Sequence, residues 1–261
     1  MEGQEANIHP PQPKEVSKDV LIPRGEVILG TTNPRTLTKE EFHNSSDLLF
    51  HGAREKFSFS QEIDYTKTRG TYSDTLGRGF YTTPRRENAD IYTRLRKGNH
   101  TVLEVLPYQA RMLDVRATNH PTNNAPFPEN LFNEYVSFLK NYINTSDTDF
   151  IKKMATDVNF RTRLNALQTH RDIIYALKRM EKPIDVRNIT ASEPGGTMGD
   201  VGADFFTEFM LQKGFDGLIA YEGGDSPEQT QEASVVFYNA KKVGDYEAWH
   251  PEEREETPVA A

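Results

Sequence analysis

Residues 77–83 read Gly-Arg-Gly-Phe-Tyr-Thr-Thr, two glycines followed by aromatic and β-branched residues. This order predicts a short strand that begins at a tight turn, because glycine is favoured in turns and aromatic and β-branched residues are favoured in strands. Upstream, 48–50 (Leu-Leu-Phe) predicts a second short strand that ends at His51-Gly52. Downstream, 87–94 predicts a helix. Strand and helix patterns therefore alternate over short distances in this part of the chain.

Further strands and helices are predicted on both sides of this region. Apolar residues spaced three and four apart predict a helix over 132–143 and another over 160–177, which makes 118–196 a mainly helical insert. The remaining predictions are a helix that opens with the capping-box spacing of 38–41, a helix at 203–213, and strands at 101–106, 110–115, 215–220 and 234–238. Short interrupted strands mixed with helices define an α+β fold class.

The composition excludes several kinds of chemistry. The chain has 261 residues, no cysteine and a net charge of −8. Without cysteine there are no disulfides, thiolate nucleophiles or cysteine-ligated metal centres. The seven histidines are scattered and show no metal-binding spacing, so no metal is expected. The acidic balance gives no reason to expect duplex nucleic acid or an anionic membrane as a partner.

The two ends differ in composition from the middle. Residues 1–25 are polar and rich in proline, which predicts a disordered leader, and 248–261 form an acidic tail. One folded domain is therefore expected over 26–247. No stretch approaches the roughly 18 apolar residues of a membrane helix, and the start lacks the apolar core of a secretory signal. We expect a cytoplasmic protein, or one exported without a standard signal peptide.

Four segments carry a more specific signal through their order and spacing. They are 49–54 (Leu-Phe-His-Gly-Ala-Arg), 77–83, 89–92 (Ala-Asp-Ile-Tyr) and 231–237 (Gln-Glu-Ala-Ser-Val-Val-Phe). Together they resemble the ADP-ribosyltransferase superfamily, on the His-Tyr-Glu side shared by diphtheria-type toxins and poly(ADP-ribose) polymerases. That family uses a His-Gly on its first strand, a tyrosine in a Gly-x-Gly strand, a second tyrosine on the next helix and a glutamate at the start of a late strand. Tyr81 and Tyr92 are 11 positions apart, the spacing of the polymerases.

The resemblance implies a fold of two packed, mostly antiparallel sheets and a site that cleaves NAD+. The backbone of Gly52 would bind the nicotinamide carboxamide, which a side chain at this position would block. Tyr81 and Tyr92 would stack on the two faces of the ring. His51 would hydrogen-bond a ribose hydroxyl. A glutamate, here Glu232, would stabilise the positive charge that develops on the ribose.

Two positions depart from the family pattern. Alignment of the last strand places Ala233 or Ser234 where the family has its glutamate, and Glu232 lies two residues before Ser234. An irregular segment before Ser234 would be needed to bring Glu232 into the site. The other departure is Ala89, where the polymerases usually carry a serine that bonds the carboxamide. Its loss removes one hydrogen bond, about 0.5–1.5 kcal/mol.

Each motif by itself has an ordinary structural interpretation: a turn histidine, a half-buried strand tyrosine, a helix-face aromatic or a solvated loop carboxylate. In combination they predict a mono-ADP-ribosyltransferase that uses NAD+ as substrate and a protein as acceptor, with nucleic acid less favoured and no membrane partner. Both a toxin or effector and a housekeeping enzyme are compatible with the sequence. Two alternatives stay open: an NAD+ glycohydrolase, and an ADP-ribose or NAD+-binding module without catalysis.

Overall fold

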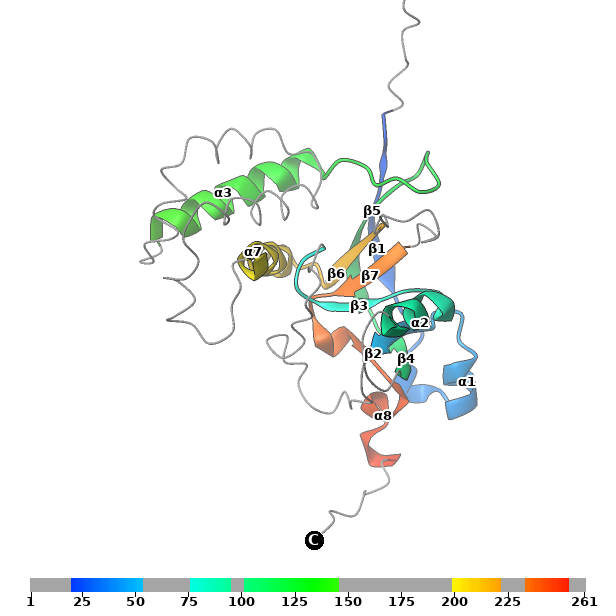
Figure 1. Ribbon diagram of the computed structural model, residues 1–261. Coiled ribbons are helices and arrows are strands. Elements are labelled where there is room, and N and C mark those ends of the chain that lie inside the picture. The colour runs from blue at the N-terminus through cyan, green and yellow to red at the C-terminus, as the bar shows by residue number, and fades with distance from the viewer. Residues whose placement is uncertain (1–19, 54–75, 95–100, 146–198, 222–232, 254–261) are drawn as a thin grey trace, which may run out of the picture.

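A computed structural model of the chain describes residues 20–53, 76–94, 101–145, 199–221 and 233–253 (Figure 1). These residues form two sheets. The five-stranded sheet has the order β1-β5-β6-β7-β3, and the three-stranded sheet has the order β2-β4-β8. The strands are β1 (Pro23–Leu29), β2 (Leu49–Ala53), β3 (Phe80–Thr82), β4 (Thr101–Pro107), β5 (Ala110–Ala117), β6 (Gly217–Tyr221), β7 (Ala233–Phe237) and β8 (Val243–Gly244). Every strand predicted from the sequence is present.

The helices also follow the predicted positions. Thr38 and Glu41 form the expected capping box, since the Glu41 backbone N–H donates to the Thr38 hydroxyl and the Thr38 N–H donates to the Glu41 carboxylate. The helix predicted at 132–143 is observed, whereas the one predicted at 160–177 lies outside the described residues. The described helices are η1 (Pro34–Thr36), α1 (Lys39–His43), α2 (Arg86–Arg94), α3 (Glu129–Thr145), α7 (Gly199–Gln212), η3 (Ala240–Lys242), α8 (Tyr246–Trp249) and η4 (Pro251–Glu253).

The five-stranded sheet is covered on both faces. Side chains alternate across a strand, so neighbouring residues of β5 and β7 face opposite sides. Leu113 and Val236 face α7 and α3, whereas Met112 and Phe237 face Leu103 of the three-stranded sheet. Figure 1 shows the helices α3 and α7 on one side and β2 and β4 on the other. Burial on both faces explains why these strands read as apolar runs rather than as an alternating pattern.

The pairing pattern supports the α+β class. Only β5 and β6 run parallel among the pairs of named strands that the structure describes, and the other pairs are antiparallel. The two sheets meet at one corner, where Phe50 and Thr83 exchange two backbone hydrogen bonds of 2.8 and 2.9 Å. This bridge places the end of β3 beside β2. The strands that carry the His-Gly and Gly-x-Gly motifs are therefore neighbours.

The folded part extends beyond both predicted boundaries. Strand β1 begins at Pro23, inside the predicted leader, and pairs with β5. At the other end, Trp249 and His250 were assigned to the acidic tail but are buried. The Trp249 ring packs with Phe42 and Leu106, and its indole N–H reaches the Leu106 carbonyl oxygen at 3.2 Å. A single tryptophan among acidic residues therefore closes a small core, which average composition does not reveal.

Candidate functional site

His51 and Tyr81 are joined by a hydrogen bond. The His51 Nδ1 atom lies 2.6 Å from the backbone oxygen of Tyr81. A carbonyl oxygen can only accept, so Nδ1 carries a proton, and in the neutral form of the ring Nε2 is then the acceptor. The imidazole also packs on Phe80, with ring centroids 4.3 Å apart. The histidine is therefore held in one orientation and one tautomer by the strand that carries the predicted tyrosine.

The Tyr81 ring is fixed by its hydroxyl group. This hydroxyl accepts from the Leu76 backbone N–H at 3.0 Å and donates to the Gly77 carbonyl at 2.7 Å. Both partners belong to the turn that leads into β3. The ring is half-buried and packs against the core beneath α7. Since two hydrogen bonds hold its far end, the ring forms a rigid wall rather than a mobile side chain.

The two glycines of the Gly-x-Gly motif are required by packing. Gly77 has a φ of +92°, a conformation that residues with a side chain rarely adopt. At Gly79 a Cβ atom would lie 2.6 Å from the Phe237 carbonyl oxygen. The turn therefore lies directly on β7. The glycines bring β3 and its tyrosine against the neighbouring strand, which accounts for them without a phosphate-binding role.

The backbone of Gly52 lies where β2 and β3 separate. Phe50 uses its N–H and C=O toward Thr83, so by strand alternation the N–H and C=O of Gly52 point to the same edge. Within the described residues the pairing of these strands stops at the Phe50–Thr83 bridge. Gly52 thus presents one donor and one acceptor on the edge of β2 that faces β3.

Helix α2 explains the absence of a side chain at Gly52. A Cβ atom there would lie 2.3 Å from the Ala89 carbonyl oxygen and 3.0 Å from Cγ2 of Thr93. From the sequence, a ligand that approaches the backbone closely was expected to require a glycine at this position. The structure adds a different requirement, because the space beside its Cα atom is filled by the helix. Ala89, where the polymerases carry a serine, is itself buried in this contact.

Tyr92 lies in the same helix, three residues after Ala89. Residues three apart on a helix are neighbours on its surface, and α2 packs on β2. The backbone of the second predicted tyrosine is therefore on an element that touches Gly52. Its side chain is not among the parts of the chain that the structure describes.

The predicted acid is not among the described residues. Strand β7 begins at Ala233, directly after Glu232, and both Ala233 and Ser234 are buried. Ala233 pairs with Tyr221 at the end of β6, and Ser234 pairs with Ala220. The described start of this strand therefore carries small side chains and no carboxylate at the position that aligns with the family glutamate.

A charged cluster that the sequence interpretation missed lies on the side of β2 that faces α2. Glu104 of β4 contacts His43 of α1, with Oε2 and Nδ1 2.5 Å apart, and also forms an ion pair with Arg86 of α2. Glu104 stands directly opposite Phe50 in the β2–β4 ladder. A glutamate inside the otherwise apolar strand 101–106 was the signal that could have identified it.

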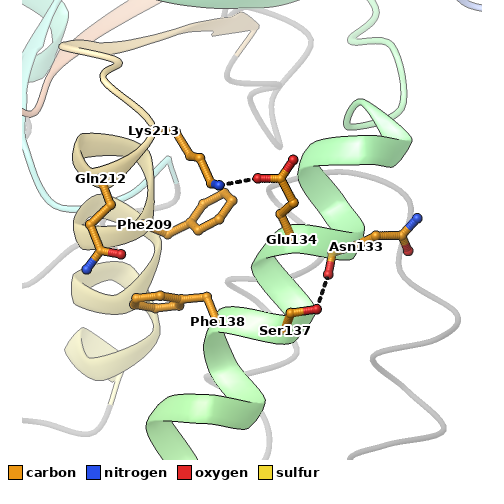
Figure 2. Close-up of a pocket in the computed structure, with 7 residues that line it drawn as sticks. All are labelled: Asn133, Glu134, Ser137, Phe138, Phe209, Gln212 and Lys213. Atoms are coloured by element: carbon orange, nitrogen blue, oxygen red, sulfur yellow. Dashed lines mark hydrogen bonds and ion pairs between the residues drawn. The ribbon is translucent and has the colours of Figure 1, made fainter.

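A groove lies elsewhere, between α3 and α7 (Figure 2). It has a volume of about 440 Å³, and none of its lining residues belongs to the motifs. The rings of Phe138 and Phe209 form its apolar wall, and Glu134 and Lys213 form an ion pair at its rim. The groove is part of the helical layer on the opposite face of the five-stranded sheet from β2.

Within the described ranges, no three His, Asp or Glu side chains are grouped so that they could hold a metal ion. None of the helices in those ranges has the length and apolar character needed to cross a bilayer. Comparisons of the chain with family models, with curated proteins and with solved structures found no match. The functional argument therefore depends on the geometry of His51, Gly52 and Tyr81.

Proposed function

We propose that this protein is a mono-ADP-ribosyltransferase of the His-Tyr-Glu type, which transfers ADP-ribose from NAD+ to a protein acceptor. The observation that carries the proposal is the hydrogen bond between His51 and the Tyr81 backbone, beside the edge of β2 at Gly52, with which no strand of the described residues pairs. Three motif residues from two distant segments thereby share one corner of the fold. The two-sheet α+β architecture is compatible with the fold of that superfamily.

The corner offers complementary groups for nicotinamide. A primary carboxamide has one acceptor oxygen and an NH₂ donor, which match the N–H and C=O of Gly52 on one strand edge. The fixed Tyr81 ring provides a flat surface for the pyridine ring, and Tyr92 on α2 supplies the second. Stacking of this kind contributes about 0.5–1.5 kcal/mol per aromatic pair beyond buried area.

His51 is suited to bind the adjoining ribose. Its Nδ1 proton is engaged by Tyr81, so Nε2 accepts a hydrogen bond from a sugar hydroxyl. Because the ring is also packed on Phe80, little side-chain freedom is lost on binding. The role of this histidine is to hold NAD+ in one pose.

The reaction breaks the C–N bond between nicotinamide and ribose. The bonding electrons leave with neutral nicotinamide, and the ribose develops positive charge. A nucleophile of the acceptor forms the new bond to this carbon and releases its proton to water or to a base. A carboxylate near the ribose stabilises the charge, and Glu232, directly before β7, is assigned to this role.

A second function is favoured by the start of β7. Ala233 and Ser234 are buried small residues where the family has its acid. If Glu232 does not approach the ribose, the same corner binds NAD+ or ADP-ribose without cleaving it. The chain would then be a binding module rather than a transferase.

One experiment separates these functions. The full-length protein is incubated with NAD+ labelled in its adenylate part, with and without a cell lysate, and released nicotinamide is measured. Label attached to protein supports transfer, and free ADP-ribose with nicotinamide release in the absence of lysate identifies a glycohydrolase. Binding of NAD+ without turnover identifies the binding module. No binding and no turnover would refute the proposal.

A further inference from the structure

The carboxylate of Glu104 holds two helices at once. One oxygen contacts Nδ1 of His43, the last residue of α1, at 2.5 Å, and the other forms an ion pair with Arg86, the first residue of α2. Glu104 is itself fixed in β4, in the middle of the three-stranded sheet. A single side chain therefore contacts both the end of α1 and the start of α2.

The position of Arg86 is unfavourable for the helix alone. A cation in the first turn opposes the helix dipole, which prefers negative charge at this end. The charge of Glu104 offsets this cost. The guanidinium group also lies over the Phe50 ring, 6.0 Å from its centroid. Arg86 thus contributes to the placement of α2 on β2 rather than to helix formation.

Two contacts align α2 with β2. Arg86 lies over Phe50, and Ala89, three residues later, lies against Gly52, two residues later on the strand. The two contacts therefore lie at successive positions along both elements, so the first part of the helix follows the strand from Phe50 to Gly52. The next buried residue on this face of the helix is Thr93, whose Cγ2 atom would lie 3.0 Å from a Cβ atom at Gly52, and Tyr92 directly precedes it in the chain. Loss of the first contact would remove the charged attachment at the start of the helix and leave its packing against Gly52.

We infer that Glu104 is a positioning residue of the nicotinamide site: through Arg86 it fixes α2, and with it Tyr92, at the correct distance from β2. This inference rests on the proposed function. Glu104 does not itself touch NAD+ in this scheme. Substitution of Glu104 should therefore weaken the binding of NAD+, which carries the nicotinamide ring. It should leave the binding of ADP-ribose, which lacks the ring, almost unchanged.

The test compares NAD+ with ADP-ribose, which lacks the ring, by titration calorimetry on the full chain. Glu104→Gln is expected to lower the affinity for NAD+ about tenfold, which corresponds to about 1.4 kcal/mol of binding free energy. The affinity for ADP-ribose should change less than twofold. Arg86→Gln should have the same effect. The double variant of Glu104 and Arg86 should lose no more NAD+ affinity than either single variant, since both substitutions remove the same contact. Arg86→Lys, which keeps the charge, should recover part of the affinity.

Glu26→Gln is the matched control. Glu26 forms an exposed ion pair with Arg111 between β1 and β5, on strands that do not include the motifs. It should leave the affinities for both ligands unchanged. An equal loss of affinity for NAD+ and ADP-ribose in Glu104→Gln would indicate general destabilisation and overturn the positioning role, as would no loss for either. If the wild-type protein binds neither ligand, the proposed function fails and the inference falls with it.

Discussion

The imidazole of His51 donates a hydrogen bond of 2.6 Å to the backbone oxygen of Tyr81, a residue 30 positions away. The bond connects β2 and β3 just beyond the point where their backbone pairing stops. It therefore has two consequences that can be separated: it helps to hold the two sheets together, and it fixes the tautomer of the histidine.

Substitutions of His51 test these two consequences. His51→Ala removes the hydrogen bond and is expected to lower the free energy of unfolding by about 0.5–1.5 kcal/mol for that bond. His51→Asn keeps a donor near the position of Nδ1 but has no counterpart of Nε2. We expect it to recover stability in urea unfolding and still to bind NAD+ poorly. Equal NAD+ affinity in His51→Asn and the wild type would exclude a role for Nε2.

Gly52→Ala tests the contact with α2. The added methyl group would meet the Ala89 carbonyl oxygen, so the helix must shift. We expect a loss of about 1–3 kcal/mol in unfolding free energy, as for other overpacked sites, together with weaker NAD+ binding. Gly25→Ala is the control, because a Cβ atom there meets nothing within 4 Å and only its positive φ is costly. That variant should bind NAD+ normally.

Tyr81→Phe keeps the ring and removes the hydroxyl. The buried N–H of Leu76 then loses its partner, which costs about 1–3 kcal/mol of stability. NAD+ binding should fall much less than in Tyr81→Ala. In a double-mutant cycle, Tyr81→Ala and Tyr92→Ala should be non-additive, because each ring supports the same ligand. Zero coupling energy would place the two tyrosines in different sites.

Glu232→Gln tests the assigned acid. It keeps the size of the side chain and removes the charge, so kcat for ADP-ribose transfer should fall by about 10²–10³. Affinity for NAD+ should change little, because the charge matters mainly in the transition state. Glu228→Gln is the matched control from the same segment and should be active. Transfer at the wild-type rate by the Glu232 variant would require another acid.

Trp249→Ala tests the revised domain boundary. The side chain is 7% exposed and its indole N–H bonds the carbonyl oxygens of Leu106 and Gly244. Removal of such a buried aromatic group costs about 3–5 kcal/mol. Leu211→Ala, at a half-exposed position on α7, should cost much less. If the stability of Trp249→Ala in urea unfolding is unchanged, the segment around Trp249 does not belong to the folded domain.

The elements were predictable where the local pattern and the tertiary environment agree. Pro107 separates two apolar segments in the sequence, and the structure ends β4 at this residue. The 3–4 spacing over 132–143 predicted α3 because one face of that helix is buried against α7. Strand β1 was missed because Pro23 and Gly25 are unfavourable in a strand; both are tolerated on an edge strand with an irregular register.

The candidate site was predicted only as a set of residues. The motifs identified His51, Gly52 and Tyr81, but not the bond that joins the histidine to β3. That contact depends on the packing of two sheets and has no local signal. The same holds for Gly52, whose conflict with a side chain arises from a helix more than 30 residues away in sequence.

The pairing of β3 with β7 has a consequence for biosynthesis. The Thr82 hydroxyl bonds the Val235 carbonyl oxygen, across 153 positions of sequence. Contacts of such high sequence separation form slowly, because a long loop must close before they contribute. While the chain is still attached to the ribosome and has not reached Val235, β3 lacks β7, the strand with which it pairs in the five-stranded sheet. The pairing that fixes β3 in the five-stranded sheet therefore forms only after Val235 has been synthesised.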